Sequence, residues 1–211
     1  MIVRSCLNAV PNTEHPKRTL IGCLAKDMFI LPTASLINRH AFETVGGFDE
    51  RLSGYEDDDL FLRMFRHGYD NVYLNKALAK WRIFSGSTSY TPRMGRSRMI
   101  YLRKLLADFP PDEWRGASYA RDLLAPRFFP SLLAEYRRAV RVGDGETLRI
   151  AVEDLKILVP YLPRRARVLM QVALPFMARK TPATLGTKVA DLRLPLVRTF
   201  IRLALHRPIG G

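Results

Sequence analysis

The chain has 211 residues, enough for one large domain or one and a half ordinary ones, and its hydrophobic content of 47 % is typical of a globular protein with a real core. The longest apolar stretch, residues 168–178, is interrupted by Gln171 and Pro175 and is far shorter than the roughly 20 residues that span a bilayer, which excludes a membrane span there. The net charge of +14 and the pI of about 10.3 favour an anionic partner: nucleic acid, an anionic membrane surface or a phosphorylated substrate.

The cysteines and the first residues bear on the compartment. Cys6 and Cys23 have no CxxC or other metal-like spacing, which favours two thiols in a reducing, cytosolic environment. No basic segment followed by a long apolar core comes after Met1, so we expect no secretory signal. The sequence therefore predicts a cytoplasmic protein, with peripheral attachment to the inner face of the plasma membrane as a further option.

Two short elements are predicted ahead of residue 46. Residues 1–28 are weakly patterned. Residues 29–38 have few polar side chains and predict a buried strand. Asn38 is a suitable N-cap for a short helix over residues 39–45, which Gly46 closes.

A helix headed by acids follows, over residues 57–67. Gly68 stops this helix with His67 in its last turn, a normal C-terminal signal. Two short strands and then a polar turn are predicted next, over residues 72–74, 79–84 and 85–89.

The pattern is helical from Arg93 onward. The predicted helices cover residues 94–107, 128–142, 146–159, 164–179 and 185–207. From Lys156 to the end there are eleven Lys or Arg and one acid, Asp191. The last segment mixes regular arginines with a wide apolar stripe, as interfacial membrane helices do, so peripheral binding to an anionic membrane is predicted. The alternative is a helix docked on its own core, with its arginines in solvent.

The stretch from Val45 to Arg63 says the most about function. Two glycines, an aromatic residue and two acids come first, as Gly46-Gly47-Phe48-Asp49-Glu50. After a short loop come four consecutive acids, Glu56, Asp57, Asp58 and Asp59. The apolar residues that follow share one helix face by their spacing: Leu60, Phe61, Met64 and Phe65.

Two explanations fit the row of acids. Acids in the first turn of a helix complement its dipole and its free N–H groups, for about 0.3–1 kcal/mol each. Two caps would suffice for that purpose, however, and four adjacent like charges repel one another. Such repulsion raises the pKa of one carboxyl, which suits a general base.

The joint pattern of Gly46-Gly47-Phe48-Asp49-Glu50, then Glu56-Asp57-x-x-Leu60 and Arg63, resembles the signature of family-2 glycosyltransferases. These are inverting, nucleotide-sugar-dependent enzymes of GT-A fold. The resemblance covers roughly residues 20–105. It implies an α/β fold: the C-terminal part of a GT-A (Rossmann-like) domain over residues 1–105, holding the acceptor and base half, followed by an α-helical basic region over residues 106–211.

The resemblance also implies roles for single residues. Asp57 takes the place of the general base on the acceptor hydroxyl, Glu56 supports it, and Asp59 is the second candidate for the base. The acceptor site is implied at four consecutive residues, Gly46, Gly47, Phe48 and Asp49.

The donor side of the reaction is less complete in this sequence. Arg82 is placed to face a diphosphate, with a surface-strand arginine as the alternative. Phe84 stands where the family carries a His, so no metal ligand is assigned, although the family uses Mn or Mg. The Asp-x-Asp motif and the N-terminal strand-loop of such enzymes are not found, so we expect the nucleotide-binding half to be missing from this chain.

The expected function is transfer of a sugar from a nucleotide-sugar donor to a glycan or lipid-linked acceptor, in cell-envelope polysaccharide synthesis. One alternative is a non-catalytic remnant that binds or scaffolds without turnover. Another is a nucleic-acid-binding protein, which would explain the charge of +14. The sequence has no helix-turn-helix glycine pattern, zinc spacing or aromatic-basic motif, so no nucleic-acid partner is expected.

Overall fold

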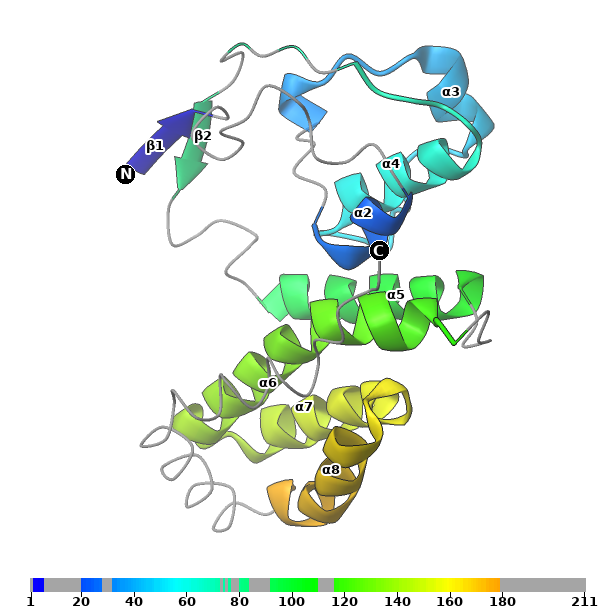
Figure 1. The fold of residues 1–211 in the computed structure, drawn as a ribbon. Coiled ribbons are helices and arrows are strands. Elements are labelled where there is room, and N and C mark those ends of the chain that lie inside the picture. Colours follow the sequence, from blue (N-terminus) through cyan, green and yellow to red (C-terminus); the bar gives the residue numbers. More distant parts are fainter. Residues whose placement is uncertain are drawn as a thin grey trace. The chain divides into compact units, whose positions relative to one another are not determined.

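The computed structural model describes residues 2–5, 20–27, 32–72, 74, 76, 80–83, 92–109 and 116–178 (Figure 1). Within the chain, two compact units are distinguished, Met1–Lys104 and Leu105–Gly211. Several sequence predictions fall outside the described residues: Cys6, the turn over 85–89 and the basic helix over 185–207.

The first unit combines short helices with one pair of strands. Its described elements are β1 (Ile2–Ser5), α2 (Leu20–Ala25), the 3₁₀ turn η1 (Pro32–Ala34), α3 (Arg39–Thr44), α4 (Glu56–Arg66), β2 (Lys80–Ile83) and most of α5 (Pro92–Asp108). β1 and β2 pair antiparallel with Ile2 opposite Ile83, and they form the only sheet in the described part of the chain (Figure 1). β2 lies within the strand predicted over residues 79–84, and α5 confirms the helix predicted over residues 94–107.

The predicted α/β fold, part of a GT-A (Rossmann-like) domain, is wrong. Such a domain is built on a parallel sheet with helices on both faces. The described residues are mostly helical and contain one antiparallel strand pair instead.

Two predicted strands account for much of this error. In the described part of residues 29–38, the chain forms η1 and then irregular structure. Pro32 begins η1, and proline cannot donate to a strand ladder. Leu36 and Val72 lie fully exposed and Leu74 is more than half exposed, so these three apolar residues do not serve a buried strand.

The two helices around the glycine pair are confirmed. Asn38 caps α3 by accepting a hydrogen bond from the Ala41 N–H at 3.1 Å. Gly46 and Gly47 follow α3 with positive φ angles of 81° and 68°, which an L side chain rarely adopts. α4 begins at Glu56 rather than Asp57 and packs on α2, with its own core residues Leu60, Phe61 and Leu62 buried.

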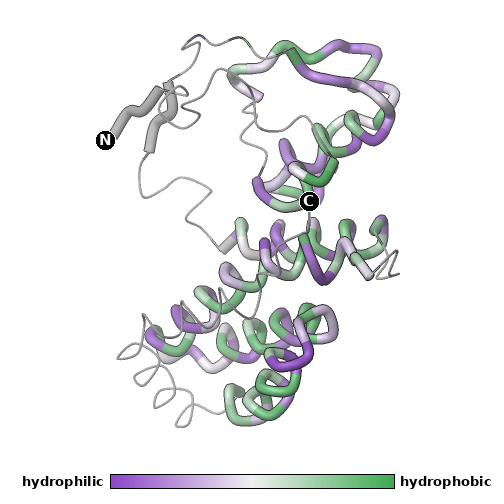
Figure 2. The backbone as a smooth tube through the Cα atoms, in the orientation of Figure 1, coloured by the Kyte–Doolittle hydropathy of each residue, from purple (hydrophilic) through white to green (hydrophobic). Residues whose placement is uncertain are grey.

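The second unit is entirely helical over its described residues. After the end of α5 come a π-helical turn, η3 (Ala120–Leu124), then α6 (Ala125–Val142), α7 (Gly145–Leu158), the 3₁₀ turn η4 (Val159–Tyr161) and α8 (Arg164–Met177). The helices predicted over residues 128–142, 146–159 and 164–179 are thereby confirmed. Apolar and polar residues alternate along each of them, as the changing colours of the tube show (Figure 2).

Apolar packing holds the second unit together. α6 packs along α7, and α8 packs on η4 and α7. Phe128 and Leu132 of α6 and Leu155 and Leu158 of α7 are buried almost completely. None of the helices in the described ranges is both long and apolar enough to cross a membrane.

Candidate functional site

The four carboxylates that open α4 lie in different environments. Asp58 and Asp59 are buried, whereas Glu56 and Asp57 are partly exposed. Asp57 Oδ1 accepts a hydrogen bond from the Asp58 N–H at 2.9 Å. The residue that precedes the acids, Tyr55, is the N-cap of α4 and makes no side-chain capping hydrogen bond. The carboxylates of this helix therefore differ in chemistry although they are adjacent in sequence.

Asp59 is bound on both of its oxygens. Oδ2 accepts from Arg63 Nε at 3.0 Å and Nη2 at 2.8 Å, and Oδ1 lies 2.6 Å from Lys104 Nζ. Its side chain is only 4 % exposed. These two cationic partners compensate the buried charge, and removing either one would leave it less well compensated.

Lys104 joins Asp59 to the glycine-rich half of the motif. The same Nζ lies 2.7 Å from Asp49 Oδ2, and Asp49 also pairs with Arg51 at 2.7 Å. Hydrogen bonds from Arg51, and then Lys104, hold the pKa of Asp49 well below its usual range, although burial opposes them. Asp49 is therefore ionised across the physiological range and is poorly suited to accept a proton.

Arg63 of α4 forms hydrogen bonds with the glycine turn. Its guanidinium donates to the backbone carbonyls of Val45 and Gly47, the latter at 2.7 Å, while it holds Asp59. The φ angle of Gly47 favours glycine, and a Cβ added there would also lie 3.1 Å from the Phe42 ring, a tight contact that the ring would have to relieve. The two halves of the sequence motif are thus one hydrogen-bonded unit.

Phe48 directly follows this glycine turn and is accessible to solvent. Its side chain is 40 % exposed and packs edge-on against Phe42, with ring centroids 5.4 Å apart. Of the residues predicted for acceptor binding, Phe48 is the one that presents an accessible apolar surface.

The environment of Asp57 makes its carboxylate more basic than usual. Burial raises its pKa, and the nearby charges of Glu56 and Asp27 raise it further, against the hydrogen bond from the Asp58 N–H. Glu56 Oε2 is itself buried and receives no hydrogen bond from the described residues. A carboxyl whose pKa is raised toward neutrality is a better general base than an ordinary exposed aspartate.

The residue before the acids is held in an unusual conformation. Tyr55 has φ 65°, the only positive φ of a residue other than glycine in the described ranges. Its ring stacks on Tyr101 at 5.5 Å, and Arg98 Nε donates to its hydroxyl at 3.2 Å. A left-handed residue beside the acids is the kind of strain that clusters at functional sites.

Sequence reasoning missed the contribution of α5. Ser97, Tyr101 and Lys104 follow one another at i, i+4 and i+7, which places them on one face of the helix. Ser97 Oγ accepts from the Ser53 N–H at 2.9 Å, Tyr101 packs on Tyr55 and Lys104 holds the two aspartates. A polar stripe on an otherwise amphipathic helix was the available signal, but its partners lie more than forty residues away in sequence.

Arg82 is not brought to this site by any described contact. It lies on β2 opposite Val3, and its side chain is outside the described part of the structure. Phe84 is outside it too, so a role of this segment toward a diphosphate stays a prediction.

The described residues do not fit a divalent cation. They contain no group of three or more His, Cys, Asp or Glu side chains that could hold a metal ion. Asp49 and Asp59 already carry cationic partners. These residues are therefore assigned no metal-dependent role.

Comparison with known families agrees with the motif. Residues 16–108 match the family described as "Glycosyltransferase like family 2". The match includes the glycine turn, α4 and all of α5, so the residues that build the site lie inside it. The resemblance is thereby confirmed, and this part of the chain is a glycosyltransferase-like family 2 region. No curated protein and no solved structure matches the chain.

Proposed function

We propose that the site at α4 serves the acceptor side of a glycosyl transfer. A nucleotide sugar would be the donor and a glycan or lipid-linked hydroxyl the acceptor, in cell-envelope polysaccharide synthesis. The observation that carries the proposal is the contrast within one helical turn: Asp57 has a raised pKa, whereas Asp59 is bound by two cations.

In this proposal Asp57 is the base. As the acceptor oxygen attacks the anomeric carbon, its proton passes to a carboxylate oxygen of Asp57, and the nucleoside diphosphate leaves from the opposite face. The charge of Glu56 strengthens the proton affinity of Asp57. Asp59 and Asp49 hold the frame through Lys104 and do not exchange protons.

The accessible ring of Phe48 offers an apolar surface for the acceptor sugar, next to the turn of Gly46 and Gly47. Arg82 remains the proposed partner of the donor diphosphate. The family generally depends on a divalent cation, but the described residues of this chain supply no group of ligands for one. We place the reaction in the cytoplasm, with the basic region against the inner face of the membrane.

The test is transfer by this chain supplied together with a nucleotide-binding half, because we expect that half to be missing from the 211 residues. Labelled UDP- and GDP-sugars serve as donors, and a lipid extract of the source organism serves as acceptor. The nucleoside diphosphate released is measured. Asp57→Asn keeps the size and the hydrogen-bond acceptor but cannot take the proton, so turnover should fall about 10²–10⁴-fold.

Glu50→Gln, an exposed acid of the same motif, is the matched control and should keep full turnover. Unchanged turnover in Asp57→Asn would remove Asp57 from the base role. No transfer by the wild-type chain with any of these donors would favour a binding role without catalysis.

A further inference from the structure

One face of α8 is apolar and open. Val168, Leu169, Val172 and Phe176 are exposed by 53 %, 53 %, 62 % and 56 %. They follow one another at i, i+1, i+4 and i+8, so they share one side of the helix. The opposite side, with Ala166 and Leu174 buried, packs on the rest of the unit. Apolar exposure gathered on one side of a helix marks an interaction surface rather than scattered surface residues.

Two arginines lie at the N-terminal end of the same face. Arg164 precedes Val168 by four residues and Arg165 precedes Leu169 by four, so both arginines head the apolar stripe. Both are exposed. No Asp or Glu occurs from Arg164 to Ala178, so the face contains no carboxylate to neutralise them. The surface is thus complementary to a partner that presents both apolar groups and negative charge.

Two possible partners come from the protein itself, a second copy of the chain and residues 179–211, but neither supplies the negative charge. A second copy docked through α8 would bring more arginines and no acid to the contact. Residues 179–211 carry seven Lys or Arg against the single acid Asp191, so they too would add positive charge. An anionic lipid surface supplies acyl chains for the apolar stripe and phosphates for the arginines together.

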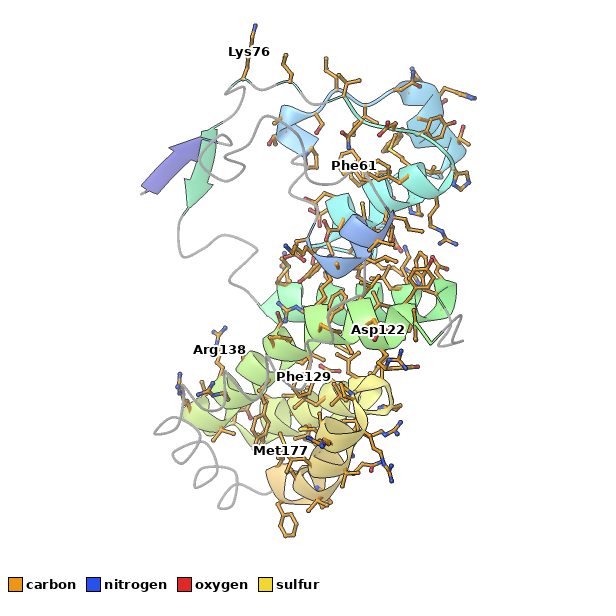
Figure 3. All side chains as sticks on the ribbon, viewed as in Figure 1. Phe61, Lys76, Asp122, Phe129, Arg138 and Met177 are labelled. Atoms are coloured by element: carbon orange, nitrogen blue, oxygen red, sulfur yellow. The ribbon has the colours of Figure 1, made fainter. Side chains whose placement is uncertain are left out.

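We propose that α8 lies in the headgroup region of an anionic membrane. Val168, Leu169, Val172 and Phe176 enter the boundary with the acyl chains, and Arg164 and Arg165 bind lipid phosphates. Met177 marks the C-terminal end of this helix in Figure 3. The inference rests on the membrane location proposed above and assigns the contact to named residues of the described chain. Binding is peripheral, since α8 has 14 residues and does not cross the bilayer.

Co-sedimentation of the whole chain with vesicles tests the assignment. We expect binding to vesicles of phosphatidylcholine and phosphatidylglycerol, weaker binding at high salt, and little binding to phosphatidylcholine alone. The double variant Val172→Ser/Phe176→Ser should bind at least about tenfold more weakly, because it removes apolar burial in the interface. Arg164→Gln and Arg165→Gln should each weaken binding about fivefold.

Ile150→Ser is the matched control. Ile150 is 52 % exposed and belongs to α7, not to the α8 stripe, so this variant should bind as the wild type does. Helical circular dichroism checks that each variant is folded. The experiment needs no sugar donor, so its outcome is independent of whether the chain transfers sugar.

Three outcomes would overturn the assignment. Wild-type binding by the Val172→Ser/Phe176→Ser variant would remove α8 from the contact. Loss of binding on deletion of residues 179–211, with the α8 variants unaffected, would move the contact to that segment. Conversion of a dimer to a monomer by the α8 variant, without vesicle binding by the wild type, would make the face a contact between two copies.

Discussion

α4 and α7 both begin with acids, but only one of them is an ordinary capped helix. In α7 a single residue, Asp144, accepts from the Glu146 and Thr147 N–H groups at 3.1 and 3.2 Å. In α4 the N-cap is Tyr55, and four acids fill the first turn. One aspartate is enough to cap a helix of this protein, so the hydrogen bond from the Asp58 N–H to Asp57 Oδ1 does not by itself explain all four acids of α4.

The two units also differ in what they bury. The first unit buries Asp58, Asp59 and Ser97 among its apolar residues, whereas Ser118 is the one buried polar or charged residue among the described residues of the second. Burial of a charge is unfavourable unless it is paired, and Arg63 and Lys104 supply the pairs for Asp59. The buried carboxylates therefore occur in the same unit as the candidate site.

Removing one partner from the buried pair should have the largest effect. Arg63→Met takes one cation from Asp59 and leaves the carbonyls of Val45 and Gly47 without their donor. We expect a loss of about 3–5 kcal/mol of unfolding free energy, measured by urea denaturation. Asp59→Asn added to Arg63→Met should restore part of that loss, because it removes a buried carboxylate that keeps only Lys104 as its cationic partner.

Two comparisons sharpen this result. Arg39→Met breaks the exposed pair with Glu43 and should cost less than about 1 kcal/mol. Phe128→Ala in α6 should cost about 3–5 kcal/mol through a cavity, and Asp59→Asn should not restore it. If the losses of unfolding free energy from Arg63→Met and Asp59→Asn simply added, the two residues would not be coupled, which would contradict their ion pair.

The backbone at Tyr55 should give an intermediate effect with an unusual order. Tyr55→Ala removes the stacking on Tyr101 and leaves a Cβ at φ 65°, whereas Tyr55→Gly removes the stacking but accepts that angle. We expect the alanine variant to be less stable than the glycine variant by about 1 kcal/mol in urea denaturation. Inside a helix the order is the reverse. A more stable alanine variant would mean that the chain does not hold this residue in the left-handed region.

Local signals made α3, α4 and the helices of the second unit predictable. Asn38, Gly46 and Gly68 act within one turn of their own positions, so a sequence pattern captures them. The strand predicted over residues 29–38 failed because apolar composition alone does not distinguish a strand from an irregular segment that begins with Pro32.

The site was predictable only in part, for a different reason. Asp57 and Asp59 are two residues apart and look alike in sequence, but their partners set them apart. Those partners include Lys104, which lies on another helix. A sequence pattern specifies which carboxylates are near one another along the chain, and tertiary packing decides which one is neutralised.

The smallest expected effect is a gain in stability from Asp57→Asn. The folded chain raises the pKa of Asp57 through burial and the charges of Glu56 and Asp27, so the ionised carboxylate destabilises the folded state. This destabilisation is absent below the ordinary pKa of 3.8, where the folded and unfolded states both hold the proton, and it is complete above the raised pKa. The asparagine variant should therefore match the wild type at low pH and exceed it at pH 7 by about 0.5–1 kcal/mol.

Asp49→Asn should show the opposite sign. Arg51 and Lys104 lower the pKa of Asp49, so its ionised form stabilises the fold, completely above the ordinary pKa of 3.8 and less as pH falls below that value. The variant should therefore be less stable than the wild type at pH 7, and the difference should shrink at the acid end of the range. Thermal unfolding of both variants and the wild type between pH 3.5 and 7 separates the two cases. If Asp57→Asn were also less stable at pH 7, Asp57 would be a structural carboxylate like Asp49 and Asp59. A substitution that raises stability while it abolishes transfer is the behaviour expected of a residue kept for its chemistry, because the fold alone would favour the neutral side chain.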